Sequence, residues 1–460
     1  MTEQRDGRTA ITMVVVMITS FITPFMVNAI SLVIPAIGLE FGASQSMLNW
    51  VVSGFLIATA SFLLPFGRLA DQYGRKRIFM LGMMFLAASS LGCVLSPSLA
   101  FLIFFRVIQG ISSAMILGTS MAILTSIVPP QSRGKALGFI SATTYMGLSC
   151  GPPLGGLISS AFSWRAVFVF NMAIALFVLF LTGWKLKGEW KGEASKIDGG
   201  GIVFCILAQG LMLFGLNNLA SGLLHQASFV LGLILLVVFF IYEKRHSNPL
   251  IQLESIMKNR TFAFSNLSAL INYSATFAMT FLISLYLQAA LQLDAVFAGL
   301  ILLIQPVIMV VLSPVAGLLS DKLPSRVLAS IGMVICVFSL FLFIFLSAET
   351  PVLYVIFILS LTGVGFALFI TPNTNAIMSS VDKTLYGVAS SILGNMRLIG
   401  QSLSMAIVSL ITSVFIRDMS IASAGYVDGL LVSIRTSFIV FAALGCLGVV
   451  SSLVKAKPVR

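Results

Sequence analysis

The chain has 460 residues, of which 58% are apolar and only 9% are charged, and its net charge is +12. A soluble domain carries about a quarter charged residues, so this composition excludes an ordinary water-soluble protein. The basic residues lie in short clusters between long apolar segments, which favours a protein embedded in a lipid bilayer over one that binds nucleic acid.

Long apolar segments follow one another along the chain. A helix needs about 20 apolar residues to cross the bilayer core, and the sequence lacks the short alternating segments of a membrane barrel. The run after Arg8 reaches this length without a small-residue cleavage site, so we expect a transmembrane helix there and not a signal peptide. The runs predict helices at 10–37, 47–70, 78–95, 99–126, 136–160, 164–184, 198–218, 226–243, 261–291, 296–319, 327–347, 351–379, 386–415 and 433–454. We therefore expect an all-α integral membrane protein with fourteen transmembrane helices.

Basic residues concentrate in every second loop between the predicted helices. The short cytoplasmic loops of membrane proteins carry an excess of Lys and Arg. If the N-terminus is cytoplasmic, the inward loops and the C-terminal end hold Arg75, Lys76, Arg77, Arg133, Lys135, Lys185, Lys187, Lys191, Lys196, Lys244, Arg245, Lys258, Arg260, Lys322, Arg326, Lys383, Lys455, Lys457 and Arg460, against Arg165, Arg417 and Arg435 on the other side. This pattern predicts that both termini face the cytoplasm.

A short pattern recurs in the two halves of the chain. Gly67 and Asp71 at the end of the second predicted helix match Gly317 and Asp321 about 250 residues later. At nearly the same offset, a further set of matches pairs Gly138, Ser141 and Gly151 with Gly387, Ser390 and Gly400. Structural repeats of this kind let transporters build a site near the middle of the membrane. We predict a six-helix bundle at 1–197, an inserted two-helix linker at 198–260 and a second six-helix bundle at 261–460.

The loop after the second predicted helix carries the most specific motif. It reads Gly67-Arg68-Leu69-Ala70-Asp71-Gln72-Tyr73-Gly74-Arg75-Lys76-Arg77 and resembles the hallmark loop of the major facilitator superfamily. Glycine allows a tight turn and a close helix approach, and a carboxylate at the membrane edge can meet a helix N-terminus or a basic residue in one conformation only. We predict a gating role for Gly67, Asp71, Gly74, Arg75 and Lys76, and for the counterparts Gly317 and Asp321. The alternative is a solvated turn whose charges set the topology.

The fourth predicted helix contains Arg106-Val107-Ile108-Gln109-Gly110, which is similar to the second motif of this superfamily. Charge inside a membrane is costly and usually faces the bundle interior or a cavity. We therefore expect Arg106, Gln109 and Gly110 to have a functional role. The alternative is that the Arg106 side chain extends to the outer surface.

The fifth predicted helix contains Gly147-Leu148-Ser149-Cys150-Gly151-Pro152-Pro153-Leu154-Gly155-Gly156. This run resembles the motif that exporters of the superfamily carry, which implies an antiporter role for Gly147, Gly151, Pro152, Gly155 and Gly156. Small residues let helices approach closely and proline removes a backbone donor, so an ordinary kinked packing interface is the alternative.

The resemblance extends over nearly the whole chain. Trp164-Arg165, Pro249-Leu250-Ile251 and Gly387-Val388-Ala389-Ser390-Ser391 are similar to segments of the fourteen-span drug:proton antiporter subfamily, the multidrug efflux type. The resemblance implies the major facilitator fold and a monomer in the plasma (inner) membrane that exports small amphipathic compounds by alternating access, coupled to proton influx. The alternatives are export of a specific metabolite and facilitation without protons.

Other classes of function lack their motifs in this sequence. No phosphate-binding loop of an ATP-driven pump is present. The two histidines, His225 and His246, fall in loops predicted on opposite sides of the membrane, so they cannot form a catalytic or metal site together. We therefore expect no enzymatic activity, no cofactor and no bound metal.

The sequence departs from the subfamily pattern in the first helix. Met26 stands where an Asp is expected before Pro35, and no acid is predicted at mid-membrane. Proton coupling usually needs a carboxylate whose protonation changes between the two faces. The remaining candidates are Glu40 and Asp71 at the membrane edges and His225 in a predicted outer loop, and the alternative for each is an ordinary solvated charge.

Polar side chains inside the predicted helices are the candidates for a substrate cavity. They are Asn28, Asn272, Gln305, Asn373, Asn375, Asn395 and Arg397. A buried amide must find a hydrogen-bond partner, so bonding between helices is an alternative role for each of them. With Arg106 and Arg397 in the spans and no buried acid, we expect neutral, zwitterionic or anionic substrates to be tolerated better than lipophilic dications.

Overall fold

In the computed structural model, the residues described are 2–43, 45–186, 188–191, 198–217, 219, 222–246, 250, 259–416 and 425–453. Every long regular element within these ranges is a helix. The helices are α1 (Thr2–Phe41), α2 (Gln45–Tyr73), α3 (Arg75–Val94), α4 (Leu99–Ile127), η1 (Pro130–Ser132), α5 (Arg133–Ala161), α6 (Trp164–Lys185), α7 (Gly199–Asn217), α8 (Leu223–Arg245), α10 (Arg260–Thr276), α11 (Met279–Leu285), η3 (Tyr286–Ala290), α12 (Ala295–Leu302), α13 (Ile304–Lys322), α14 (Ser325–Phe343), α15 (Val352–Ser379), η4 (Lys383–Leu385), α16 (Tyr386–Phe415) and α17 (Tyr426–Leu453).

Each of the fourteen predicted spans coincides with a helix or a continuous run of helices. In the described part of the chain, 13 segments are long and apolar enough to cross a membrane, with α10, α11 and η3 forming one of them and α12 and α13 another. The remaining predicted span is α5, which contains many Gly, Ser and Thr residues. The predicted all-helical membrane fold is thus confirmed.

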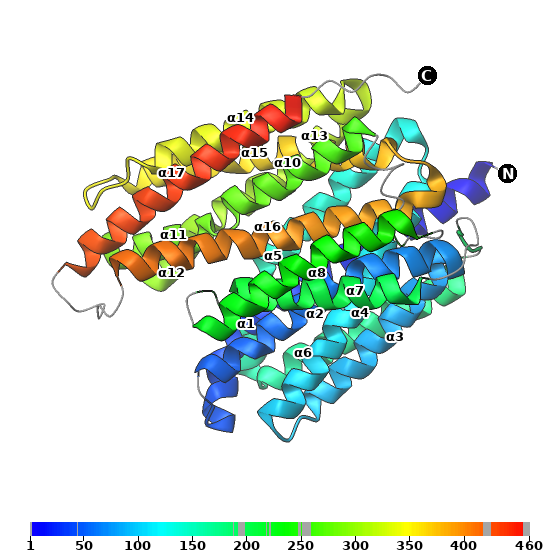
Figure 1. The fold of residues 1–460 in the computed structure, drawn as a ribbon, viewed down its shortest axis with the longest axis horizontal. Helices are drawn as coiled ribbons and strands as arrows, with labels where there is room; N and C mark the ends of the chain where they lie inside the picture. The colour runs from blue at the N-terminus through cyan, green and yellow to red at the C-terminus, as the bar shows by residue number, and fades with distance from the viewer. Residues whose placement is uncertain are drawn as a thin grey trace.

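The long helices form two bundles with an inserted pair between them. Helices α1 to α6 make one bundle, α10 to α17 make the other, and α7 and α8 lie against their junction (Figure 1). The bundles meet where α5 packs on α13 and where α2 and α4 pack on α16, and α7 contacts both α2 and α16. The start of α1 and the end of α17 lie at the same end of the molecule (Figure 1).

Parts of the predicted linker and termini lie outside the described residues. These are 192–197, 247–249, 251–258 and 454–460, so the predicted domain boundaries at 197/198 and 260/261 stay predictions. The orientation argument also used Lys187, Lys196, Lys258, Arg417, Lys455, Lys457 and Arg460, which fall outside the same ranges.

Helix α5 approaches α1 through the glycines of the predicted antiporter motif. A Cβ added at Gly147 would lie 2.2 Å from the Phe21 carbonyl oxygen, and one at Gly155 would lie 2.7 Å from the Ala29 Cβ. Gly151 is equally crowded, since its added Cβ would lie 2.7 Å from the Asn28 Cβ. Only glycine fits at these positions without moving the backbone of α1 or α5.

Gly147→Ala is expected to destabilise the protein by about 1–3 kcal/mol, because the added methyl group overpacks the α1–α5 contact. The measurement is the thermal unfolding midpoint of purified protein in detergent, which should fall. Gly156→Ala is the matched control, since its added Cβ meets only the flexible end of Leu32 at 3.0 Å. Equal midpoints for the two variants would show that this glycine contact does not limit stability.

Candidate functional site

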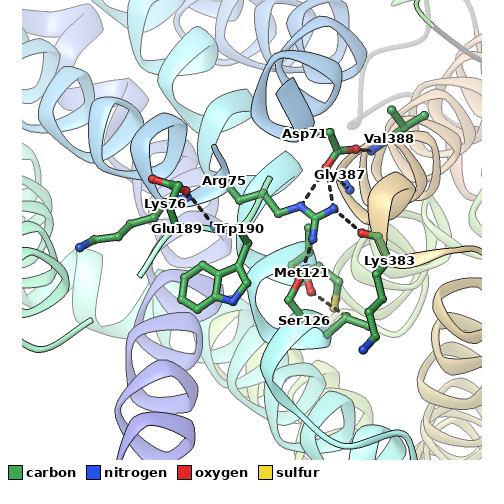
Figure 2. Close-up of polar contacts among 12 residues, drawn as sticks. Asp71, Arg75, Lys76, Met121, Ser126, Glu189, Trp190, Lys383, Gly387 and Val388 are labelled. Atoms are coloured by element: carbon green, nitrogen blue, oxygen red, sulfur yellow. Dashed lines mark hydrogen bonds and ion pairs between the residues drawn. The ribbon is translucent and has the colours of Figure 1, made fainter. Parts of the chain in front are cut away.

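Asp71, at the end of α2, binds the first turn of a helix in the opposite bundle. Its Oδ1 accepts a hydrogen bond from the Gly387 N–H at 3.0 Å, and its Oδ2 accepts one from the Val388 N–H at 3.0 Å (Figure 2). These N–H groups belong to the N-terminus of α16, where backbone donors lack helical partners and the helix dipole is positive. The carboxylate, which is 2% exposed, therefore joins α2 to α16.

Arg75 strengthens the same contact. Its Nε donates to Asp71 Oδ1 at 2.8 Å, its Nη1 to Ser126 Oγ at 2.6 Å and its Nη2 to the Lys383 carbonyl at 2.6 Å (Figure 2). The guanidinium also lies 5.5 Å from the centre of the Tyr386 ring. One buried cation thus holds α4, the loop before α16 and the carboxylate of Asp71 together.

Asp321, at the end of α13, makes the equivalent contact in the other half. Its Oδ1 accepts from the Gly134 N–H at 2.7 Å and its Oδ2 from the Lys135 N–H at 2.9 Å, at the N-terminus of α5. Ser325 occupies the position four residues later that Arg75 occupies after Asp71, so this position cannot supply an ion pair like that of Arg75. The two contacts define what we name the closed end of the molecule.

The structure corrects the register of the repeat on α5 and α16. Gly134, and not Gly138, is the counterpart of Gly387, because these two residues donate to the paired carboxylates. Small residues recur about one helical turn apart on the contact face of α5, so the sequence alone allowed the shifted alignment.

Glycines in both halves allow these helix ends to touch. A Cβ added at Gly67 would lie 2.7 Å from the Ser391 Cβ and 2.8 Å from the Gly387 carbonyl oxygen. A Cβ at Gly317 would lie 2.2 Å from the Gly134 carbonyl oxygen. Any larger side chain would therefore separate the bundles at the closed end.

A third acid at the closed end was not predicted. Glu189 Oε1 accepts a hydrogen bond from the Lys76 N–H at 2.8 Å, at the start of α3 (Figure 2). Gly74 adopts a positive φ of 120°, and a side chain there would collide with this carboxylate. In sequence, Glu189 looks like an ordinary loop acid, and only the helix start at Arg75 could have indicated a capping partner.

Arg106 lies inside the first bundle and does not reach the outer surface. It is 1% exposed; its Nε donates to the Val51 carbonyl at 2.8 Å and its Nη1 to Gln109 Oε1 at 2.6 Å. Gln109 continues the network to Ser90 Oγ at 2.8 Å. Gly110 lets α4 approach α2, since its added Cβ would lie 2.4 Å from the Phe55 carbonyl oxygen. The alternative of an outward-extended Arg106 is therefore wrong.

A cavity of about 320 Å³ lies between the two bundles. It is lined by residues of α1, α2, α4, α5, α7, α10, α15 and α16, so both bundles and one helix of the inserted pair form its wall. Two of the predicted cavity residues, Asn28 and Arg397, are on this wall. Among the described lining residues there is no carboxylate.

The other five predicted cavity residues are buried elsewhere. Four of them bond to neighbouring helices: Asn272 to Met333 Sδ at 3.2 Å, Asn373 to the Ser265 carbonyl at 3.1 Å, Asn375 to Ser320 Oγ at 3.1 Å and Asn395 to Gln209 Oε1 at 2.9 Å. Gln305 is 9% exposed near the start of α13. In this conformation, these side chains contribute to helix packing and are not on the cavity wall.

Comparisons with known proteins agree with this architecture. Residues 16–405 match the family model described as Major Facilitator Superfamily. The chain is 27% identical over 400 residues to the riboflavin transporter RibZ of Clostridioides difficile (strain 630), covering 87% of each protein. It is 28% identical over 385 residues to multidrug resistance protein 3 of Bacillus subtilis (strain 168), covering 82% of this chain and 74% of that protein.

A solved structure shares the fold. The crystal structure of the human organic anion transporter MFSD10 (TETRAN) superposes with a TM-score of 0.67 and covers 97% of this chain and 99% of that chain. The identity is 14%, so this likeness concerns the fold alone.

Asp71→Asn is expected to open the closed end, because the amide loses the ion pair with Arg75 and one of its two acceptor atoms. Charge-assisted hydrogen bonds of this kind contribute about 1.5–3 kcal/mol, roughly a tenfold or larger change in the population of this conformation. Spin labels at the exposed residues Gln131 in η1 and Thr384 in η4 would report longer and broader distances.

Asp294→Asn is the matched control for this measurement. Asp294 also accepts a helix N-terminal hydrogen bond, from the Val296 N–H at 2.9 Å, but within its own helix. Its replacement should leave the label distances unchanged. Unchanged distances in Asp71→Asn as well would remove the proposed role of this contact in closing the end.

Proposed function

Because the chain belongs to the Major Facilitator Superfamily, we propose that it exports small amphipathic compounds by alternating access. Family membership makes it a multi-pass membrane transporter and not an enzyme. The relatives named as multidrug resistance proteins support export of varied compounds, and the relative named as a riboflavin transporter supports a flat amphipathic substrate.

The observation that carries this proposal is the cavity between two bundles that are joined at one end. For a compound to pass, the contacts of Asp71 with α16 and of Asp321 with α5 must break, and the opposite ends of the bundles must close. We therefore assign Gly67, Asp71, Arg75, Gly317 and Asp321 to the gate, with Gly74 and Lys76 shaping the turn beside it.

The basic loops support an orientation in the membrane. We propose a location in the plasma membrane with both termini and the closed end on the cytoplasmic side, since Arg75, Lys76 and Arg133 lie at that end. The described conformation then faces outward. We further propose that a single chain is the working unit, because its own two bundles and α7 surround the cavity.

Proton influx is the proposed driving force. Asp71 could lose its bond to α16 on protonation, because a neutral carboxyl group is attracted less to a helix N-terminus and to Arg75. Glu40 is bound by Trp164 Nε1 at 2.7 Å and Arg165 Nη1 at 2.8 Å at the other end of the bundle. Facilitation without protons is the second candidate, and the absence of a carboxylate among the described residues of the cavity wall favours it.

The test is transport by purified protein in liposomes. Vesicles with an acidic lumen should accumulate riboflavin or a neutral drug several-fold above vesicles without a pH gradient, and a proton ionophore should abolish the difference. Asp71→Asn should slow transport at least about tenfold, as expected for loss of a charge-assisted contact, whereas Asp294→Asn should not.

Each other outcome selects an alternative. Equal uptake with and without the gradient would support facilitation without protons. Gradient-driven uptake of riboflavin alone, with no uptake of a panel of unrelated drugs, would support export of a specific metabolite. No transport of any compound would contradict the proposal.

A further inference from the structure

Arg397 is the only charged side chain on the described wall of the cavity. It lies on α16, half-buried, with its guanidinium 5.5 Å from the centre of the Tyr273 ring. Within the ranges that the structure describes, this guanidinium has no hydrogen bond and no ion pair. A guanidinium carries five N–H donors, so its hydrogen-bonding capacity in this conformation is unused by the protein.

The two fully buried arginines show the contrast. Arg75 is paired with Asp71, and Arg106 donates to the Val51 carbonyl and to Gln109. Both are bound within the protein framework, and neither lines the cavity. Arg397 alone combines a place on the cavity wall with a charge that no described residue balances.

The surroundings of Arg397 select the chemistry of a ligand. Guanidinium does not lose its proton in proteins, and an unbalanced charge in the membrane interior is costly. An oxyanion removes this cost, because the planar donor array of arginine fits the two oxygens of a carboxylate or sulfonate. A cationic ligand would be repelled, since no carboxylate among the described lining residues offsets the Arg397 charge.

Aromatic residues next to Arg397 add a second requirement. Tyr145 of α5 and Tyr273 of α10 line the same cavity, one from each bundle, together with Phe55 and Phe277. Aromatic rings stack on flat apolar groups, and a volume of about 320 Å³ is within the range of small-molecule pockets. The wall therefore suits a compact aromatic body attached to one anionic group.

We propose that Arg397 is the specificity-determining residue of the cavity, binding the oxyanion of an aromatic monoanion whose ring lies among Tyr145, Tyr273 and Phe277. This inference rests on the proposed transport function, because it names the substrate class of the same cavity. It predicts that an anionic compound is bound more tightly than its neutral and cationic analogues of equal size.

The experiment uses three anthracenes that differ mainly in charge: anthracene-9-carboxylate, anthracene-9-carboxamide and (anthracen-9-ylmethyl)trimethylammonium. Binding to the full-length protein in detergent is measured as the ligand-dependent rise of the unfolding midpoint. The carboxylate should bind about tenfold or more tightly than the amide, and the ammonium most weakly. If the unsubstituted protein binds the amide as tightly as the carboxylate, or binds the ammonium more tightly than the carboxylate, the proposal is overturned.

Variants locate the effect at Arg397. Arg397→Gln should lose about tenfold in carboxylate affinity while amide affinity stays the same, and Arg397→Lys should keep part of the preference. Arg435→Gln, at an exposed position on α17, is the matched control and should bind all three compounds normally. An undiminished preference for the carboxylate in Arg397→Gln would overturn the assignment.

Two further readouts separate the possible failures. In the first, sodium sulfate is tested as a ligand in place of anthracene-9-carboxylate. If sulfate binds as tightly as the carboxylate does, the site is a simple anion site and the aromatic requirement is overturned. Uptake of the amide into proteoliposomes with no charge preference would leave the transport function standing and remove only this inference. If the carboxylate binds clearly but no compound is taken up into proteoliposomes, the result contradicts the transport function instead.

Discussion

Two carboxylates that accept hydrogen bonds from the first turns of helices in the opposite bundle hold the described conformation together. Each places a negative charge where backbone N–H groups lack helical partners, so these hydrogen bonds are strong while the bundles touch. When the bundles separate, the same N–H groups lose their carboxylate partner. Glycines at the helix ends make the required approach possible. The contacts of Arg75 with the Lys383 carbonyl and the Tyr386 ring depend on the same approach, so the cavity is closed on one side as long as these bonds persist.

The sequence predicted the fold well because bilayer thickness fixes the length and composition of a spanning helix. The recurrence of Asp71 as Asp321 also carried over directly into equivalent positions at the closed end. The alignment of Gly138 with Gly387 was wrong, since small residues repeat along α5 and hydrophobic patterns do not fix which turn meets the carboxylate.

The cavity wall was harder to predict than the contacts of the closed end. An amide inside a span must find a partner, but its sequence position does not reveal whether that partner is another helix or a substrate. Asn395 bonds to Gln209 of the inserted pair, whereas Asn28 bonds to the Leu148 carbonyl and still reaches the cavity. Arg106 and Arg397 both look like arginines inside a span when only the sequence is considered. The structure shows that Arg106 is buried in the first bundle and that Arg397 lies on the cavity wall.

The inserted pair has a consequence for how compounds reach the cavity from the side. Leu213 and Asn217 of α7 are part of the cavity wall, and Gln209 ties α7 to α16 while the same helix packs along α2. Helix α7 therefore stands between the cavity and the lipid at the junction of the two bundles. A compound that entered the cavity from the bilayer at this junction would have to displace α7.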